Sequence, residues 1–222
     1  MVLVSGNGTN LQALIEAEKK GAFGTGKDTF GRISAVLSDR NGAYALERAK
    51  VAGIPVIVAE PDKKLPKEKR REELSDRILK IAANQCAGLL VLSGFLSILT
   101  GKIIRYYSGR IINLHPALLP KFGGEGMYGD RVHRAVLEMG EKESGCTVHL
   151  VDKGTDTGPI LLQRRVPVLP EDTPDTLARR IHWEEHFAIV EAAVKIAGRL
   201  NEQQHLSNDQ AFWENLERFK EE

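Results

Sequence analysis

Short apolar runs alternate with longer amphipathic stretches along the first half of the chain. The apolar runs predict strands at Met1–Val4, Ile33–Leu37, Val56–Val58, Gly88–Leu92 and Arg110–Leu114. Helices are expected between them, near Leu11–Lys20, Ala43–Val51, Lys67–Asn84 and Ile98–Tyr107. Strands that alternate with helices need crossover connections. The pattern therefore predicts an α/β fold with a mostly parallel central sheet and helices on both faces.

The pattern changes from Gly145 onward. Cys146–Val151 and Ile160–Val168 read as two strands joined by the turn-rich loop Asp152–Pro159. Two adjacent strands with a short connection form an antiparallel pair, because a parallel pair needs a longer crossover. The sequence therefore predicts a C-terminal antiparallel strand pair next to the parallel sheet.

The C-terminal part of the chain is predicted to be helical. A long helix is expected over roughly Pro174–Leu200, with Thr173 as its N-cap. Residues 1–200 are then expected to form one domain, and Asn201–Gln210 reads as a linker. An amphipathic terminal helix is expected from the spacing of Phe212, Trp213, Leu216 and Phe219.

Composition narrows the classes of partner and compartment. The 222 residues can bury a sizeable core, and the formal net charge of +1 gives no global field that favours nucleic acid or an anionic membrane. No run of 18 apolar residues and no signal-peptide layout occur in the sequence. Cys86 and Cys146 are expected to be free thiols. We therefore expect a soluble, cytoplasmic protein without nucleic-acid or membrane partners.

A glycine-rich segment, Ser5–Asn10, separates the first strand from the first helix. Its glycines allow close backbone approach, and the start of a helix offers free N–H groups at the positive end of its dipole. The third glycine of a dinucleotide fingerprint is missing, so the spacing favours a single phosphate over a pyrophosphate. The alternative is that the glycines serve only to turn the chain.

An amide, an imidazole and a carboxylate form the candidate reactive group. Asn113 and His115 are two residues apart in an extended segment, so their side chains can point to one side, and Pro116 should end the strand. Asp156 follows in the turn-rich loop after the next strand. This combination suits attack on a carbonyl, with Asn and His stabilising the oxyanion and Asp orienting His or relaying protons. A strand-end cap, a surface His and a turn Asp remain the alternative.

Four motifs, taken in order, resemble those of phosphoribosylglycinamide formyltransferases. They are Ser5–Asn10, Ser93-Gly94-Phe95, Asn113–Pro120 and Asp156–Ile160. The resemblance runs from Met1 to about Leu200 and implies a Rossmann-like formyltransferase fold, with an N-terminal nucleotide-binding part and a C-terminal folate-binding part. It also implies transfer of a formyl group from the cosubstrate 10-formyltetrahydrofolate to the amine of 5'-phosphoribosylglycinamide (glycinamide ribonucleotide), in de novo purine biosynthesis.

The resemblance implies a role for each matching residue. Asn113, His115 and Asp156 would form the catalytic group, and Asp156 is expected to raise the pKa of His115. The substrate-binding residues would be Gly8, Thr9 and Asn10 for the phosphate, Glu185 for hydroxyl groups and Pro116 for the glycinamide end. The pterin pocket would comprise Phe95, Leu96, Ser97, Ile98, Leu99, Asp152, Lys153, Gly154, Thr155 and Asp156. No metal is implied.

Two features depart from the common pattern of this family. Ala117 stands where a Ser is usual, and Gly123–Gly129 is a glycine-rich loop in place of a short Pro-Gly turn. This loop could be a lid over the nucleotide, or its glycines could serve turn geometry alone. His149 could tune the site or be a satisfied sheet histidine, and His133 gives no signal.

Three rival readings stay open at this stage. His182, Glu185 and His186 match an H-x-x-E-H pattern, which would indicate a zinc hydrolase, although no third ligand is evident. The sibling folate enzymes that formylate initiator tRNA or hydrolyse formyl folate are expected to carry an additional domain. The basic stretch Lys63–Arg71 is interleaved with glutamates and reads as a solvated helix face. Pattern does not decide between a monomer and a homodimer.

Overall fold

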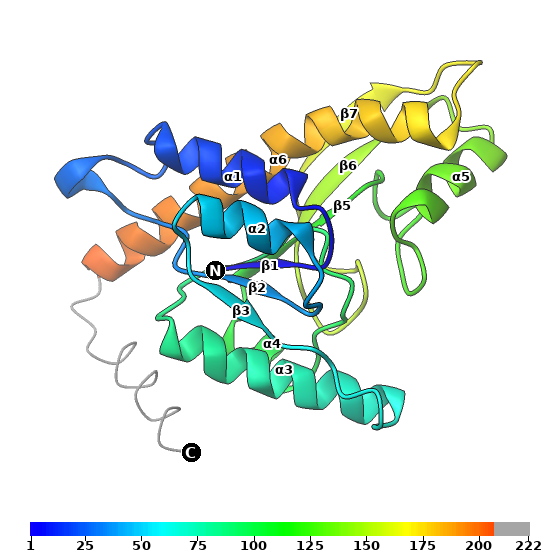
Figure 1. Ribbon diagram of the computed structural model, residues 1–222. Helices are drawn as coiled ribbons and strands as arrows, with labels where there is room; N and C mark the ends of the chain where they lie inside the picture. The colour runs from blue at the N-terminus through cyan, green and yellow to red at the C-terminus, as the bar shows by residue number, and fades with distance from the viewer. Residues whose placement is uncertain (207–222) are drawn as a thin grey trace.

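Seven strands form one sheet in the order β3-β2-β1-β4-β5-β6-β7 in the computed structural model, which describes residues 1–206 (Figure 1). The strands are β1 (Val2–Val4), β2 (Val36–Ser38), β3 (Val56–Val58), β4 (Leu90–Leu92), β5 (Ile111–His115), β6 (Glu143–Leu150) and β7 (Ile160–Pro167). The first five strands are parallel to one another, whereas β6 pairs antiparallel with both β5 and β7. The predicted fold class is confirmed.

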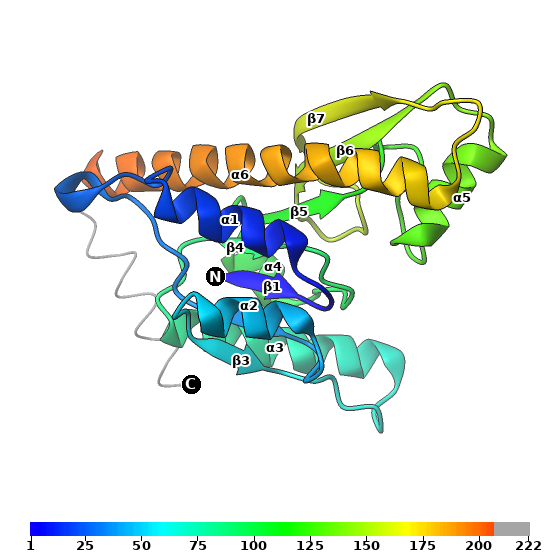
Figure 2. The same ribbon diagram turned by 45° about the horizontal axis from the view of Figure 1, so that its top comes forward.

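Helices cover both faces of the sheet. They are α1 (Thr9–Lys19), α2 (Tyr44–Val51), α3 (Lys67–Asn84), α4 (Lys102–Tyr106), α5 (Asp130–Glu138) and α6 (Pro174–Leu206), with a short 3-10 turn at Gly26–Asp28. Figures 1 and 2 show α1, α2 and α6 on one face and α3 and α4 on the other. Successive strand residues point to opposite faces. Val4 accordingly packs in the cluster that includes Leu11 of α1, while Leu3 packs in the cluster that includes Ile78 of α3.

Two helix boundaries differ from the sequence expectation. The helix expected from Ile98 begins only at Lys102, because Gly101 at its N-cap has φ 74° and the preceding residues form a loop. At the other end of the chain, α6 continues to Leu206, so the linker expected from Asn201 is wrong over its first six residues. The predicted terminal helix lies outside the described residues. Thr173 does cap α6, since its hydroxyl accepts the N–H of Thr176 at 3.3 Å.

Helix α5 was not expected from the sequence. It follows the glycine-rich segment and buries only Val132, His133 and Val136. This nine-residue helix is strongly amphipathic, so its pattern of apolar positions was a signal from which the helix could have been predicted. Figure 1 shows α5 at the far end of the sheet from β3, near the start of α6. None of the helices in residues 1–206 combines the length and apolar character needed to cross a bilayer.

Candidate active site

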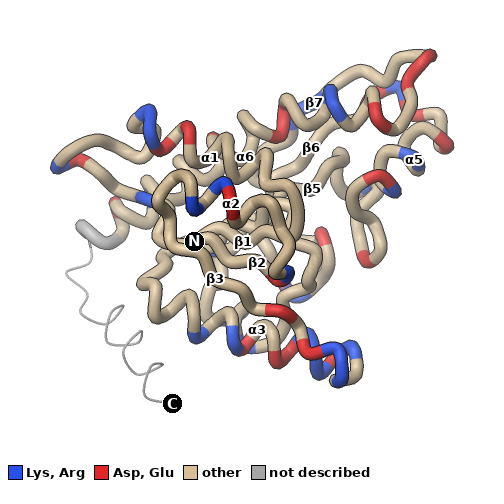
Figure 3. Tube along the Cα trace, in the orientation of Figure 1, with Lys and Arg blue, Asp and Glu red and all other residues tan. Residues whose placement is uncertain are grey.

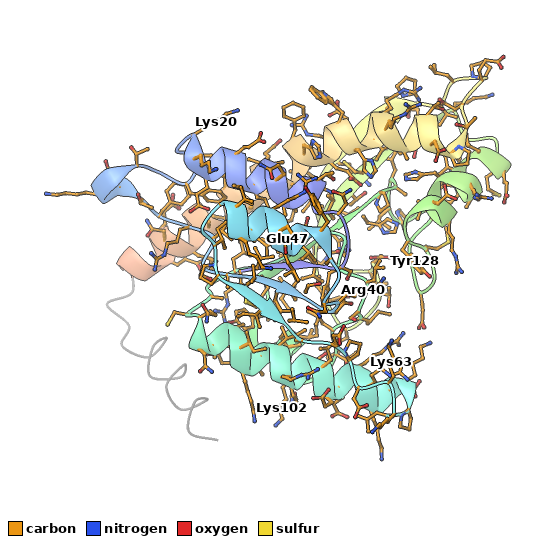
Figure 4. All side chains as sticks on the ribbon, viewed as in Figure 1. Lys20, Arg40, Glu47, Lys63, Lys102 and Tyr128 are labelled. Atoms are coloured by element: carbon orange, nitrogen blue, oxygen red, sulfur yellow. The ribbon has the colours of Figure 1, made fainter. Side chains whose placement is uncertain are left out.

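A cavity of about 800 Å³ opens where the carboxyl ends of the parallel strands meet. The chain leaves β1 toward β2 on one side and returns to β4 on the other, so β1 and β4 flank the switch point at which α/β sheets bind ligands. The cavity is lined by the loop after β1, the segment after β4, the end of β5 and part of α6. Tyr128, from the loop before α5, also lines it and is labelled in Figure 4.

Most of the residues singled out in the sequence line this one cavity. They are Gly8, Thr9, Asn10, Phe95–Leu99, Asn113, His115, Pro116, Gly154–Asp156 and Glu185. Asp152 and Lys153 are not among its lining residues. Asp152 instead shapes the loop, because its Oδ1 accepts the Gly154 N–H at 3.0 Å and the Thr157 hydroxyl at 2.7 Å. A direct contact of Asp152 and Lys153 with a ligand in this cavity is therefore not supported.

Asn113, His115 and Asp156 converge at the end of β5. The amide of Asn113 donates to Asp156 Oδ1 at 3.3 Å, and His115 Nδ1 lies 3.5 Å from Asp156 Oδ2. The antiparallel pairing of β5 with β6 places His149 opposite Asn113 and ends β6 opposite Ile112, so the loop that carries Asp156 follows directly beside Asn113. Asn113 and His115 thus reach the same carboxylate, as their spacing predicts.

The protonation of His115 differs from the sequence expectation. Burial lowers the pKa of His115 and outweighs the opposing effects of Asp156 and the Phe122 carbonyl, so the expectation of a raised pKa is wrong. Nε2 lies 2.7 Å from the Phe122 carbonyl oxygen, which can only accept, so Nε2 carries the proton. The titrating atom is therefore Nδ1, which faces Asp156.

Asp156 is held in its ionised form. Burial by itself would raise the pKa of Asp156, but its contacts with His149, His115 and the Gly124 N–H lower it. The Gly124 N–H donates to Asp156 Oδ2 at 3.0 Å. Asp156 has φ 58°, a left-handed conformation that is uncommon for a non-glycine residue. Backbone strain and a fixed anion thus coincide at this position.

His149 belongs to the same cluster. It lies opposite Asn113 in the β5–β6 ladder and is 2 % exposed. Its Nδ1 donates to the Leu150 carbonyl at 2.8 Å, and its Nε2 lies 3.1 Å from the Asn113 amide nitrogen and 3.5 Å from Asp156 Oδ1. His149 is therefore both a satisfied sheet histidine and a neighbour of the candidate catalytic group.

The glycine-rich loop forms a wall of the cavity. Its Gly124 binds Asp156, and its Glu125 forms ion pairs with Arg71, at 2.8 Å, and with Lys67 of α3. A Cβ on Gly123 would lie 2.5 Å from a Leu119 methyl carbon, so a larger residue there would require the Leu119 side chain to shift. The loop thus connects the candidate catalytic group to α3. Its expected role as a lid stays a prediction.

The loop before α1 has the geometry expected of a phosphate cradle. Gly8 adopts φ 78° at the N-cap of α1, and a Cβ there would lie 2.5 Å from Ala45 Cβ. The amide of Asn10 donates to Glu185 Oε2 at 3.0 Å, which joins α1 to α6. Burial raises the pKa of Glu185, against the effects of His182 and the Asn10 amide. The ligand-facing end of this loop is therefore tied to a buried carboxyl group.

Three buried side chains anchor the segment after β4, and the sequence analysis gave none of them this role. Ser5 Oγ accepts the Leu96 N–H at 2.8 Å, and Asp39 Oδ2 accepts the Ser97 hydroxyl at 2.7 Å. Ser75 Oγ accepts the N–H of Thr100 at 2.9 Å. Ser5 and Asp39 directly follow β1 and β2, so their positions at strand ends were the available signals.

Similarity to known proteins agrees with this geometry. The sequence profile of the formyl transferase family matches residues 1–193. The chain belongs to the formyl transferase family. It is 38% identical over 186 residues to phosphoribosylglycinamide formyltransferase of Escherichia coli, which covers 84% of this chain and 81% of that protein. A crystal structure of glycinamide ribonucleotide transformylase 1 from Symbiobacterium toebii superimposes with a TM-score of 0.78 at 38% identity, over 89% of this chain and 86% of that one.

Members of the formyl transferase family also occur within longer proteins. The chain is 44% identical over 191 residues to the trifunctional purine biosynthetic protein adenosine-3 of Drosophila melanogaster, which is 86% of this chain but 13% of that protein. This chain therefore corresponds to a small part of that relative. A formyl transferase uses a folate-derived formyl donor, which agrees with a cavity that has a phosphate-type loop at one end and an anchored segment at the other.

The formyl transferase assignment leaves the zinc hydrolase hypothesis without support. Within residues 1–206, no three His, Cys, Asp or Glu side chains are placed to hold a metal ion. Glu185 binds the amide of Asn10 and lies 3.7 Å from His182 Nε2. The basic stretch at the start of α3 likewise carries interleaved acidic residues, which Figure 3 shows as alternating blue and red.

Proposed function

We propose that this protein transfers the formyl group of 10-formyltetrahydrofolate to the amine of 5'-phosphoribosylglycinamide, giving formylglycinamide ribonucleotide and tetrahydrofolate. The observation that carries the proposal is the convergence of Asn113, His115 and Asp156 on one wall of a cavity that also contains the loop before α1. An amide donor, an imidazole and a fixed carboxylate are the groups that acyl transfer to an amine requires.

The ribonucleotide is proposed to bind with its phosphate at Gly8, Thr9 and Asn10. Free N–H groups at the start of α1 and the positive end of its dipole favour an anion there. Glu185 is proposed to accept hydrogen bonds from the substrate hydroxyls, since its carboxyl group lines the cavity within reach of Asn10. Pro116 would pack against the glycinamide end, which points its amine at the catalytic group.

The formyl donor is proposed to occupy the other end, between Phe95–Leu99 and Gly154–Asp156. Backbone groups of these two segments would recognise the pterin, and the three buried anchors hold the first segment in place. Residues 1–200 would form the catalytic domain, with residues 201–222 outside it. Residues from both halves of the chain line each end of the cavity. Glu185 of α6 lies beside the phosphate loop at one end, and Gly154–Asp156 lies beside Phe95–Leu99 at the other.

In the proposed reaction the substrate amine attacks the formyl carbon, and a new C–N bond forms as the carbonyl oxygen becomes an oxyanion. The Asn113 amide donates to this oxygen at any pH. His115 would stabilise it further only when Nδ1 is protonated, which the lowered pKa of His115 disfavours. Asp156 takes the proton from the attacking nitrogen, directly or through water. The proton then passes to the departing folate nitrogen as its bond to the formyl carbon breaks.

One assay tests the proposal. The purified protein is mixed with 10-formyltetrahydrofolate and 5'-phosphoribosylglycinamide, and tetrahydrofolate release is followed with and without the ribonucleotide. Release that depends on the ribonucleotide supports the proposal. Release into water alone, or only with initiator methionyl-tRNA as the acceptor, would assign the chain to a sibling activity instead. No release with any of the three acceptors would remove formyl transfer.

A further inference from the structure

His133 on α5 is buried at the cavity wall without a role in the chemistry described above. It is 3% exposed and lines the cavity. Its Nδ1 atom is covered by protein and has no hydrogen-bond partner among residues 1–206. A buried polar atom without a partner costs stability, so an imidazole in this position needs a reason other than packing.

The surroundings of His133 place it on the ribonucleotide side of the cavity. The charged groups that act on it are His182, which is near Glu185 on α6, Asp130 at the start of α5, and the catalytic His115. His133 is therefore within electrostatic reach of His115, at the proposed reacting end, and of His182, which neighbours Glu185.

The protonation of His133 defines what the ring can offer. Burial lowers the pKa of His133 to about 4, so the ring is neutral at neutral pH and has one N–H. A covered N–H without an acceptor is rarer than a covered lone pair, which places the proton on Nε2 rather than on the partnerless Nδ1. Because Nδ1 is covered, Nε2 is also the ring nitrogen that can reach a molecule in the cavity.

We propose that His133 is a substrate-binding residue whose Nε2–H donates a hydrogen bond to an acceptor oxygen in the ribose or glycinamide part of the ribonucleotide. The proposal rests on the proposed function, because that function supplies the ligand. A neutral donor at this position complements the carboxyl group of Glu185, which can only accept when it is ionised. The two residues together would recognise the sugar from both sides, through one donor and one acceptor.

Two substitutions at His133 separate binding from packing. His133→Leu removes the donor but keeps an apolar side chain of similar size. His133→Gln places an amide N–H near the position of Nε2. His186→Leu is the matched control, because His186 also has a buried ring nitrogen without a partner but does not line the cavity.

The experiment measures the KM for each substrate and the thermal unfolding midpoint of all four proteins. For His133→Leu we expect the KM for the ribonucleotide to rise about three- to tenfold, the range of one neutral hydrogen bond, with the KM for the formyl donor unchanged. Its unfolding midpoint should stay level or rise, since an unpartnered polar atom is removed. His133→Gln should recover most of the lost affinity, and His186→Leu should leave both KM values unchanged.

The outcomes distinguish this inference from the proposed function. An unchanged ribonucleotide KM in His133→Leu, or equal rises in both KM values with a lowered unfolding midpoint, overturns the binding role while wild-type turnover still supports the function. His133→Gln behaving like His133→Leu also overturns it. If the wild type shows neither turnover nor a thermal shift with the ribonucleotide, the proposed function fails and the role of His133 fails with it.

Discussion

Replacing Asp156 by Asn tests the centre of the proposed mechanism with almost no change in shape. In the wild type, Asp156 Oδ2 accepts the Gly124 N–H at 3.0 Å and faces His115 Nδ1 at 3.5 Å. The other oxygen, Oδ1, accepts the Asn113 amide at 3.3 Å. An Asn side chain can present its oxygen to one of these two sides only. Its NH₂ group then meets a donor on the other side, and the negative charge is gone.

The expected loss follows from these contacts. A hydrogen bond to a charged group contributes roughly 1.5–3 kcal/mol, and the substitution removes at least one and makes the others neutral. General base catalysis typically contributes about 100-fold to 10,000-fold in rate. These effects overlap because they act through one carboxylate, so we expect kcat to fall by about 1,000-fold or more. The Kd for the ribonucleotide should change less than about threefold, because a single neutral hydrogen bond is worth about that much or more and none of those proposed to hold the ribonucleotide is removed.

The assay combines tetrahydrofolate release with ribonucleotide titration by calorimetry. Thermal unfolding against pH checks that the variant folds. The pKa of Asp156 is lowered in the folded state, so its charge stabilises the fold at neutral pH and this stabilisation is lost as the pH falls through the lowered pKa. The wild type should therefore be the more stable protein at pH 7, with the difference shrinking in acid. Near-normal turnover in the variant would remove Asp156 from the mechanism, and parallel loss of ribonucleotide binding would show a distorted site.

Three further predictions follow from contacts at the edges of the cavity. Ser97→Ala leaves the buried carboxylate of Asp39 without its hydroxyl partner, so the KM for the formyl donor should rise several-fold while the KM for the ribonucleotide stays unchanged. Equal changes in both KM values would refute the anchoring role. Glu125→Gln weakens the contact of the glycine-rich loop with α3. Salt screens exposed ion pairs, so kcat/KM of the wild type should fall with ionic strength more steeply than that of the variant. The pKa of His133 is lowered from an ordinary 6.5 to about 4, so protonation favours the unfolded chain once the pH drops below about 6.5, by up to about 3 kcal/mol. Unfolding midpoints measured from pH 7 to pH 4 should therefore fall less in His133→Leu than in the wild type.

The features that depend on local periodicity could be predicted from the sequence. Helix α3 spans the predicted Lys67–Asn84, because its apolar positions repeat at helical spacing over five turns. Asn113 and His115 face one side because strand residues alternate, which needs no knowledge of the partner strand. The antiparallel β6–β7 pair was also evident, since a short turn-rich loop joins two strands with few alternatives.

The features that could not be predicted from the sequence depend on contacts between distant segments. The pKa of His115 was expected to rise, since Asp156 was the visible neighbour, but burial of the imidazole outweighs that charge and the Phe122 carbonyl. Asp39 has no sequence motif, and its role comes from a hydrogen bond across two strand ends. The proposed role of His133 depends on where α5 lies against the cavity, and the amphipathic pattern of a helix does not predict this tertiary position.

The glycine-rich loop links these observations through the protonation of the catalytic pair. Its neighbour Phe122 supplies the carbonyl that fixes the proton on His115 Nε2, and Gly124 supplies an N–H that lowers the pKa of Asp156. A seated loop also contributes to the burial that lowers the pKa of His115. Lifting the loop would expose the imidazole and remove a donor from the carboxylate, so both pKa values would move back toward their ordinary values. The seated loop thus favours an ionised Asp156 beside a neutral His115, which is the state in which the carboxylate is free to accept a proton from the attacking amine.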